Sequence, residues 1–191
     1  MNNYSRAELV ALSKLVHETA VEKGWHEKEN TDRTYRMLVI TEVAEAVEAD
    51  RKGLFGETEL HKSMIEGITG ISKVAYEKWF PWYYREKVKS SREAEMADIV
   101  IRLLDFAYEK FGDKMNWLHF DFIQPLEDFC FADNADYFIE EVLGTESKAI
   151  ATSVYYVFKW ADKLGFDLKW HIEQKMQYNR GRSYHHGGKA Y

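Results

Sequence analysis

Apolar residues recur every three to four positions along most of the chain, and this spacing predicts helices. The sequence lacks long alternating segments and the Asn-Gly or Asp-Gly pairs that open β-hairpins. The pattern therefore predicts an all-α fold with a four-helix-bundle core. The four long helices are expected over Ser5 to Lys23, Thr31 to Lys52, Ser91 to Phe111 and Asp167 to Arg182.

The ends of these helices carry recognisable start and stop residues. Ser5 is followed three residues later by Glu8, which is the capping-box pattern at a helix start. Thr31 or Asp32 is the expected cap of the second helix, and Ser91 that of the third. The expected stops are Gly24, Gly53 and Gly112.

Two regions lie outside the four-helix plan and are predicted to be mainly helical insertions. Residues 54–90 are expected to be helical from Glu57 to Trp79 and broken at Pro81. Residues 113–165 are expected to form two or three further helices. Since no flexible linker separates these regions, residues 1–191 are interpreted as one domain. Its predicted core comprises residues 5–52, 91–111 and 165–182.

Two pairs of acidic residues lie on helices that are otherwise largely apolar. Glu42 and Glu45 are three residues apart, as are Glu95 and Asp98, so each pair shares a helix face. If the two helices pack together, four carboxylates surround one cavity, where they repel unless a divalent cation neutralises them. Oxygen ligands favour Mg²⁺, with Mn²⁺ as the second choice. The alternative interpretation is a pair of solvent-exposed acidic faces.

Basic residues gather near the C-terminal end of the chain. Lys175, Asn179 and Arg182 are spaced four and three apart and so share a face, which His171 and Tyr178 flank. Lysine and arginine are natural partners of phosphate oxygens. Two roles are open for Arg102: an i,i+4 ion pair with Asp98, or a contact with an anionic substrate. Two further basic residues of this region are Arg180 and Lys189. The tail over residues 184–191 is expected to be either a flap over a ligand or a disordered end.

Composition limits the classes of function. The formal net charge is −6, which disfavours a general binder of nucleic acid polymers or of anionic membranes. No apolar run of about 18 residues occurs, and the first eight residues lack a signal-peptide core. Cys130 is the only cysteine, which excludes an intramolecular disulfide and favours a cytoplasmic location.

The ordered set Glu42-x-x-Glu45, Glu95-x-x-Asp98 and Lys175 to Arg182 resembles the all-α nucleoside triphosphate pyrophosphohydrolases. This MazG-like superfamily includes dCTP pyrophosphatases and dimeric dUTPases. The Gly24-Trp25-His26 segment and the tail from Arg182 to Lys189 also resemble members of it. The resemblance covers roughly Leu9 to Lys52, Glu93 to Phe111 and Gly165 to Lys189.

The resemblance implies Mg²⁺-dependent hydrolysis of a nucleoside triphosphate to the monophosphate and pyrophosphate. It implies that both acidic pairs are the metal ligands and catalytic residues, and that Lys175, Asn179 and Arg182 contact phosphate and sugar. Trp25 occupies a position where members enclose the base, and His26 is expected to assist. Members usually form homodimers or homotetramers, so an oligomer is expected.

Both insertions depart from the compact members of the superfamily. Residues 54–90 contain a dense group of aromatic residues, for which packing of the bundle is the favoured role over a nucleobase cap or a subunit interface. The members of this group are Tyr76, Trp79, Phe80, Trp82, Tyr83 and Tyr84. Residues 113–165 put the usual subunit arrangement in doubt.

The absence of certain sequence motifs argues against several other classes of protein. None of the seven histidines has a glutamate three residues before it, which argues against a di-iron carboxylate protein. A His-Glu-x-x-His zinc motif, a P-loop and a Gly-x-Gly-x-x-Gly motif are also missing. A non-catalytic nucleotide-binding or helical assembly module on the same scaffold stays open as an alternative. Phosphoribosyl-ATP pyrophosphohydrolase is a further alternative on that scaffold.

Overall fold

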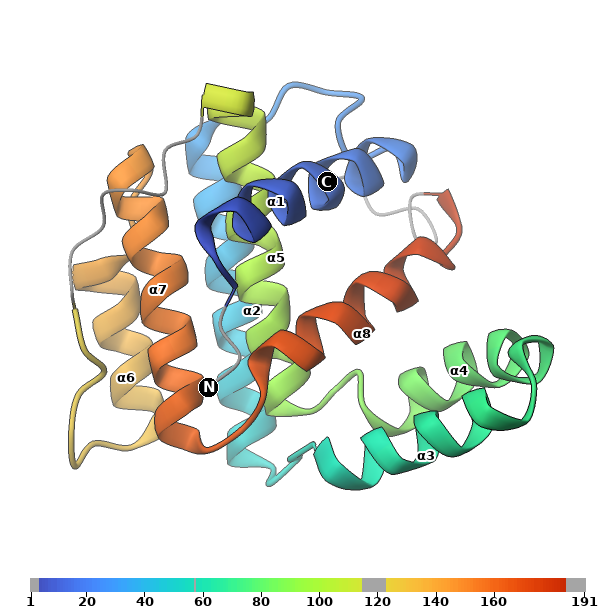
Figure 1. Ribbon diagram of the computed structural model, residues 1–191. Coiled ribbons are helices and arrows are strands. Elements are labelled where there is room, and N and C mark those ends of the chain that lie inside the picture. Colours follow the sequence, from blue (N-terminus) through green and yellow to red (C-terminus); the bar gives the residue numbers. More distant parts are fainter. Residues whose placement is uncertain (1–3, 57, 115–122, 185–191) are drawn as a thin grey trace.

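The fold is built around a central helix, α5. A computed structural model describes residues 4–56, 58–114 and 123–184. Helix α5 packs against four other long helices, as Figure 1 shows. The bounds of these five helices are Arg6–Glu22 for α1, Asp32–Arg51 for α2, Arg92–Phe111 for α5, Ser147–Leu164 for α7 and Leu168–Arg180 for α8. The part of the chain that the structure describes contains no strand, so the all-α prediction is confirmed.

The predicted capping residues begin the helices. The Ser5 hydroxyl accepts a hydrogen bond from the Glu8 amide, and the Glu8 carboxylate accepts one from the Ser5 amide, completing the capping box. Thr31, and not Asp32, caps α2. The helices also stop where glycine was predicted. Gly24 and Gly53 have φ angles of 84° and 66°, a left-handed conformation that residues with a Cβ atom rarely adopt.

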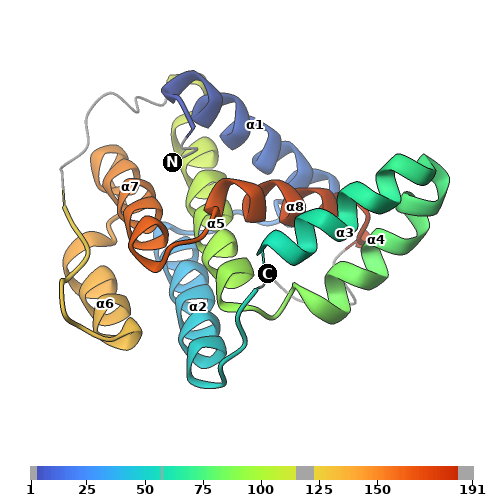
Figure 2. The same ribbon diagram turned by 60° about the horizontal axis from the view of Figure 1, so that its bottom comes forward.

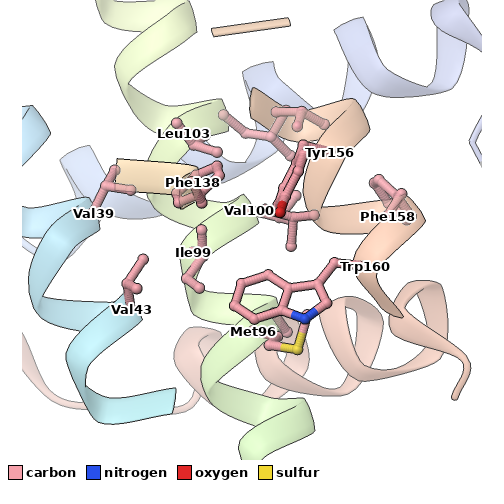
Figure 3. Close-up of a cluster of buried hydrophobic side chains, with 14 of the residues drawn as sticks. Val39, Val43, Met96, Ile99, Val100, Leu103, Phe138, Tyr156, Phe158 and Trp160 are labelled. Carbon is pink, nitrogen blue, oxygen red and sulfur yellow. The ribbon is translucent and has the colours of Figure 1, made fainter. Parts of the chain in front are cut away.

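The hydrophobic core lies where α5 contacts α2 and α7. Figure 3 shows Val39 and Val43 of α2 facing Ile99 of α5, with Trp160 of α7 closing the other side. Large side chains that are fully buried in this way each contribute about 1.5–3 kcal/mol relative to exposure. Because α5 is covered on several sides, much of it is buried, and the buried residues include the acids Glu93, Glu95 and Asp105.

The region predicted as the second insertion shares this core. It supplies the 3₁₀ turn Gly112–Lys114, α6 (Phe131–Tyr137), the π-helix η2 (Phe138–Val142) and α7. Phe138 and Tyr156 stack with their ring centroids 5.6 Å apart, in the same cluster as the residues of α2 and α5. Residues 113–165 thus contribute helices to the core of the bundle.

The region of residues 54–90 forms a helical hairpin of α3 (Thr58–Ile71) and α4 (Lys73–Lys87), which projects beside α8 (Figure 1). The predicted break at Pro81 is wrong, because the break between the two helices lies at Ser72. The Ser72 hydroxyl caps α4 by accepting a hydrogen bond from the Ala75 amide. Pro81 lies inside α4 on its exposed side. The buried side chains of Phe80 and Tyr84 flank it, and their packing compensates for the hydrogen bond that proline cannot donate.

The aromatic group of this hairpin packs a second, smaller cluster. Phe80, Tyr83 and Tyr84 are buried in it, and Tyr84 stacks on Tyr178 of α8 with ring centroids 4.9 Å apart. Trp82 stays 51% exposed. Most of these aromatic residues therefore pack the hairpin against α8 or against one another.

Among the described helices, none is both long and apolar enough to cross a bilayer.

Candidate functional site

The acidic residues of α2 and α5 meet at one place. Carboxylate oxygens of Glu42, Glu45 and Glu95 all lie within 4.8 Å of one another. Glu42 and Glu95 are buried, whereas Glu45 is exposed. The i,i+3 spacing directs each pair to one helix face, and the packing of α2 on α5 turns the two faces toward each other. These three carboxylates form what we call the acidic cluster.

Asp98 lines the same pocket but is held in an ion pair. Its carboxylate contacts the ammonium of Lys175, a residue of α8. Helix α8 crosses α5 in both ribbon views (Figures 1 and 2). Only 3% of the Lys175 side chain is exposed. Burial alone lowers the pKa of Lys175, but the carboxylates of Asp98 and Glu95 outweigh it, so the net pKa is raised and the cation persists.

Arg102 pairs with a different acid from the one predicted. Its Nε donates a hydrogen bond to Glu42 Oε1 at 2.9 Å, so the expected i,i+4 pair with Asp98 is not the contact that forms. Asp98 turns instead toward Lys175. Arg102 lines the pocket, which leaves its second predicted role, contact with an anionic substrate, open.

The nearby cations do not fully offset the burial and mutual repulsion of the carboxylates in the acidic cluster. Burial, followed by repulsion from Asp98, raises the pKa of Glu95 to about 8, although Lys175 opposes the shift. Burial and Asp98 also raise the pKa of Glu42, against the opposing effect of Arg102. Carboxylates held this close favour protonation or a bound cation. The donor set, which is all oxygen, fits a hard divalent cation such as Mg²⁺.

Polar and basic residues line the same pocket as the acids. Trp25, Asn179 and Arg182 line the pocket together with Lys175. The buried Oδ1 of Asn179 has no hydrogen-bond partner among the described residues. The structure therefore gathers into one pocket nine of the ten predicted site residues, namely Trp25, Glu42, Glu45, Glu95, Asp98, Arg102, Lys175, Asn179 and Arg182.

Two lysines of the pocket were missed by sequence reasoning. Lys23 follows α1, and Lys89 lies between α4 and α5. Lys23 Nζ donates to the backbone carbonyl of Arg180 at 2.8 Å, which joins the end of α1 to the end of α8. Neither lysine belongs to a spaced motif, so only the packing of the helices reveals that they border the pocket.

His26 is the predicted site residue that does not line the pocket. Its Nε2 lies 2.9 Å from Oδ1 of Asp105, a buried residue that borders the pocket. Burial lowers the pKa of His26, but Asp105 and Glu109 outweigh it, and the net pKa is raised. His17 contacts the same oxygen of Asp105 at 3.0 Å. Sequence reasoning missed His17 and Asp105, which are 88 residues apart.

The two residues predicted to flank the basic face are part of the packing. Tyr178 stacks on Tyr84, whose buried hydroxyl has no hydrogen-bond partner in the described ranges. The Nε2 of the fully buried His171 lies 2.9 Å from the Thr58 hydroxyl. The predicted tail flap lies outside the described residues beyond Tyr184, whose hydroxyl donates to Glu27.

Buried His171 is expected to make the fold sensitive to acid. Burial, with a smaller effect of His61, lowers the pKa of His171 from 6.5 to about 3. Below pH 6.5 the unfolded chain takes up a proton there that the folded chain refuses, so stability falls as the pH drops toward 3. Replacing His171 with glutamine is expected to reduce the loss of unfolding free energy between pH 7 and pH 5. Urea unfolding of both proteins measures this, and equal losses would contradict it.

Comparison with known proteins adds no relative. Neither a protein-family model, nor a curated protein, nor a solved structure matches this chain.

Proposed function

We propose that this chain is a Mg²⁺-dependent nucleoside triphosphate pyrophosphohydrolase that releases a nucleoside monophosphate and pyrophosphate. The observation that carries the proposal is the convergence of carboxylate oxygens of Glu42, Glu45 and Glu95 within 4.8 Å of one another, in a pocket that basic residues also line. A pocket that holds both carboxylates and cations suits a metal-bound polyphosphate. The resemblance of the spaced motifs to the MazG-like superfamily supports the same reaction.

The acidic cluster is the place for the metal. Glu42, Glu45 and Glu95 would hold Mg²⁺, or Mn²⁺ in its place, with Asp98 joining them if its pair with Lys175 opens. A bound divalent cation would screen the repulsion between the carboxylates and the phosphates and polarise phosphoryl oxygens. The raised pKa values of Glu42 and Glu95 support a site that gains stability from added positive charge.

The basic residues of the pocket would position the polyphosphate. Lys175 and Arg182 provide positive charge toward phosphate oxygens, and the unpartnered Asn179 Oδ1 accepts from a hydroxyl or amino group of the nucleoside. Trp25 is partly buried in the pocket lining and offers a ring surface for the base.

The proposed reaction is attack of water on phosphorus. The water oxygen forms a bond to the α-phosphorus. The bond between the α-phosphorus and the oxygen that bridges the α- and β-phosphates breaks, and pyrophosphate leaves with that oxygen. A carboxylate accepts the proton of the water. Glu45 suits this role, since Glu42 already accepts from Arg102 while Glu45 is exposed to solvent. Lys175 and Arg182 stabilise the negative charge that develops on the leaving group.

A panel of canonical and modified nucleoside triphosphates, each incubated with Mg²⁺ and analysed by chromatography, tests the proposal. The expected products are a monophosphate and pyrophosphate in equal amounts. Release of inorganic phosphate alone would contradict the proposed bond cleavage. Mg²⁺-dependent nucleotide binding without any product would instead favour the non-catalytic binding module. Including phosphoribosyl-ATP in the panel tests the remaining alternative, in which that compound is the preferred substrate.

A further inference from the structure

Four ionisable side chains gather beside the acidic cluster, and the proposed reaction does not use them. His17 comes from α1, His26 from the segment after it, and Asp105 and Glu109 from one face of α5. His17 Nδ1 and His26 Nε2 lie 3.0 and 2.9 Å from the same oxygen, Asp105 Oδ1. Only 15% and 10% of the two histidine side chains and 10% of the Asp105 side chain are exposed.

The second nitrogen of each ring also faces a carboxylate. His17 Nε2 lies 3.6 Å and His26 Nδ1 3.4 Å from Glu109 Oε2. A neutral imidazole has one N–H and can donate to only one of two carboxylates. If the N–H of each ring lies on the side of Glu109, the unprotonated nitrogens both point at Asp105, where a divalent cation can take the place of a proton. The two rings lie edge to face with their centroids 4.4 Å apart, so both present a nitrogen to the same carboxylate oxygen.

We propose that His17 Nδ1, His26 Nε2 and the carboxylate of Asp105 form a binding site for a divalent transition metal of the Zn²⁺ type. Two imidazoles and one carboxylate are a common ligand set for such ions, which leaves a coordination position open. The three ligand atoms lie within 4.8 Å of one another. Ligand atoms around tetrahedral zinc are about 3.3 Å apart, so small side-chain rotations close the site.

Glu109 and Tyr35 act as positioning residues. With a metal on the nitrogens that face Asp105, the opposite N–H groups of both rings would face Glu109 Oε2, at 3.6 Å for His17 and 3.4 Å for His26. The Tyr35 hydroxyl lies 3.3 Å from His26 Nδ1 and shares this nitrogen with Glu109. A carboxylate behind a metal-binding histidine fixes the ring and its tautomer, and its loss commonly costs 10–100-fold in metal affinity.

The donor chemistry separates this site from the acidic cluster. Imidazole nitrogens favour zinc-like ions, whereas carboxylates alone favour Mg²⁺. Asp105 lines the same pocket as the acidic cluster, so the two sites share a wall while using different ligands. The inference holds whether or not the chain hydrolyses nucleotides.

Calorimetric titration of the chelator-treated full chain with Zn²⁺, in excess Mg²⁺ to occupy the acidic cluster, tests the proposal. One equivalent of Zn²⁺ is expected to bind. His17→Gln and His26→Gln are each expected to weaken binding at least about 100-fold, and Glu109→Gln about 10–100-fold without a change in the melting temperature of the metal-free chain. Circular dichroism checks that each variant is folded.

Two controls identify the ligands. A variant with His185 and His186 replaced by alanine is expected to bind Zn²⁺ like the wild type, and so is Glu45→Gln. On the wild-type chain, imidazole nitrogen NMR signals of two histidines are expected to shift with one equivalent of Zn²⁺, a readout that does not depend on variant stability. Absence of binding, or binding that survives both His17→Gln and His26→Gln, would overturn the proposal.

Discussion

Replacing Glu45 with glutamine is expected to lower Mg²⁺-dependent turnover on the order of 1000-fold while leaving the helical fold intact. Glutamine has nearly the same shape but loses the charge that holds the metal and the basic oxygen that accepts a proton. A metal supplies several kcal/mol of transition-state stabilisation, and each 1.36 kcal/mol is tenfold in rate. Glu45 is exposed, so the substitution removes no core packing.

Steady-state rates of pyrophosphate release, measured with the best substrate of the panel, give this loss. Glu48→Gln is the matched control, because Glu48 lies three residues further along α2 and pairs with Arg51 and Lys52 at the surface. Its rate is expected to equal that of the wild type. A wild-type rate in Glu45→Gln would remove this residue from the active site.

Replacing Lys175 with methionine is expected to destabilise the fold by about 3–5 kcal/mol, the usual cost of breaking a buried ion pair from one side. The long apolar part of the side chain is kept, but Asp98 loses its cation next to the acidic cluster. Urea unfolding followed by circular dichroism measures the change. Of Glu42, Glu45, Glu95 and Asp98, only Glu42 then keeps a paired cation, Arg102.

Lys169→Met on the same helix is the control, since Lys169 pairs with the exposed Glu8 at 3.4 Å. Exposed ion pairs contribute about 0–1 kcal/mol, so little change is expected there. Combining Lys175→Met with Asp98→Leu is expected to restore part of the stability by removing the unpaired charge. A loss below 1 kcal/mol in Lys175→Met would show that the pair with Asp98 does not hold the site together.

The helices themselves could be read from the sequence because their signals are local. Ser5 and Ser91 cap helices, and Gly24 and Gly53 end them, through contacts within one turn of chain. Pro81 misled the prediction for the same reason. A local rule breaks the helix at proline, while the packing of its neighbours Phe80 and Tyr84, visible only in the fold, keeps α4 continuous.

The candidate site was predictable in part. Spacing alone placed Glu42 beside Glu45 and Lys175 near Asn179, because i,i+3 and i,i+4 neighbours share a helix face. Spacing did not reveal that Lys175 pairs with Asp98 and Arg102 with Glu42, since those partners are 77 and 60 residues apart.

By itself, the sequence determined the all-α class, most helix ends and which acidic residues share a face, since these follow from contacts within a turn or two of helix. Only the tertiary structure decided that α7 belongs to the core, that Asp98 is neutralised by Lys175, and that His17 and His26 meet at Asp105. Those outcomes depend on how helices cross, and crossing is fixed by side-chain packing between segments far apart in the chain.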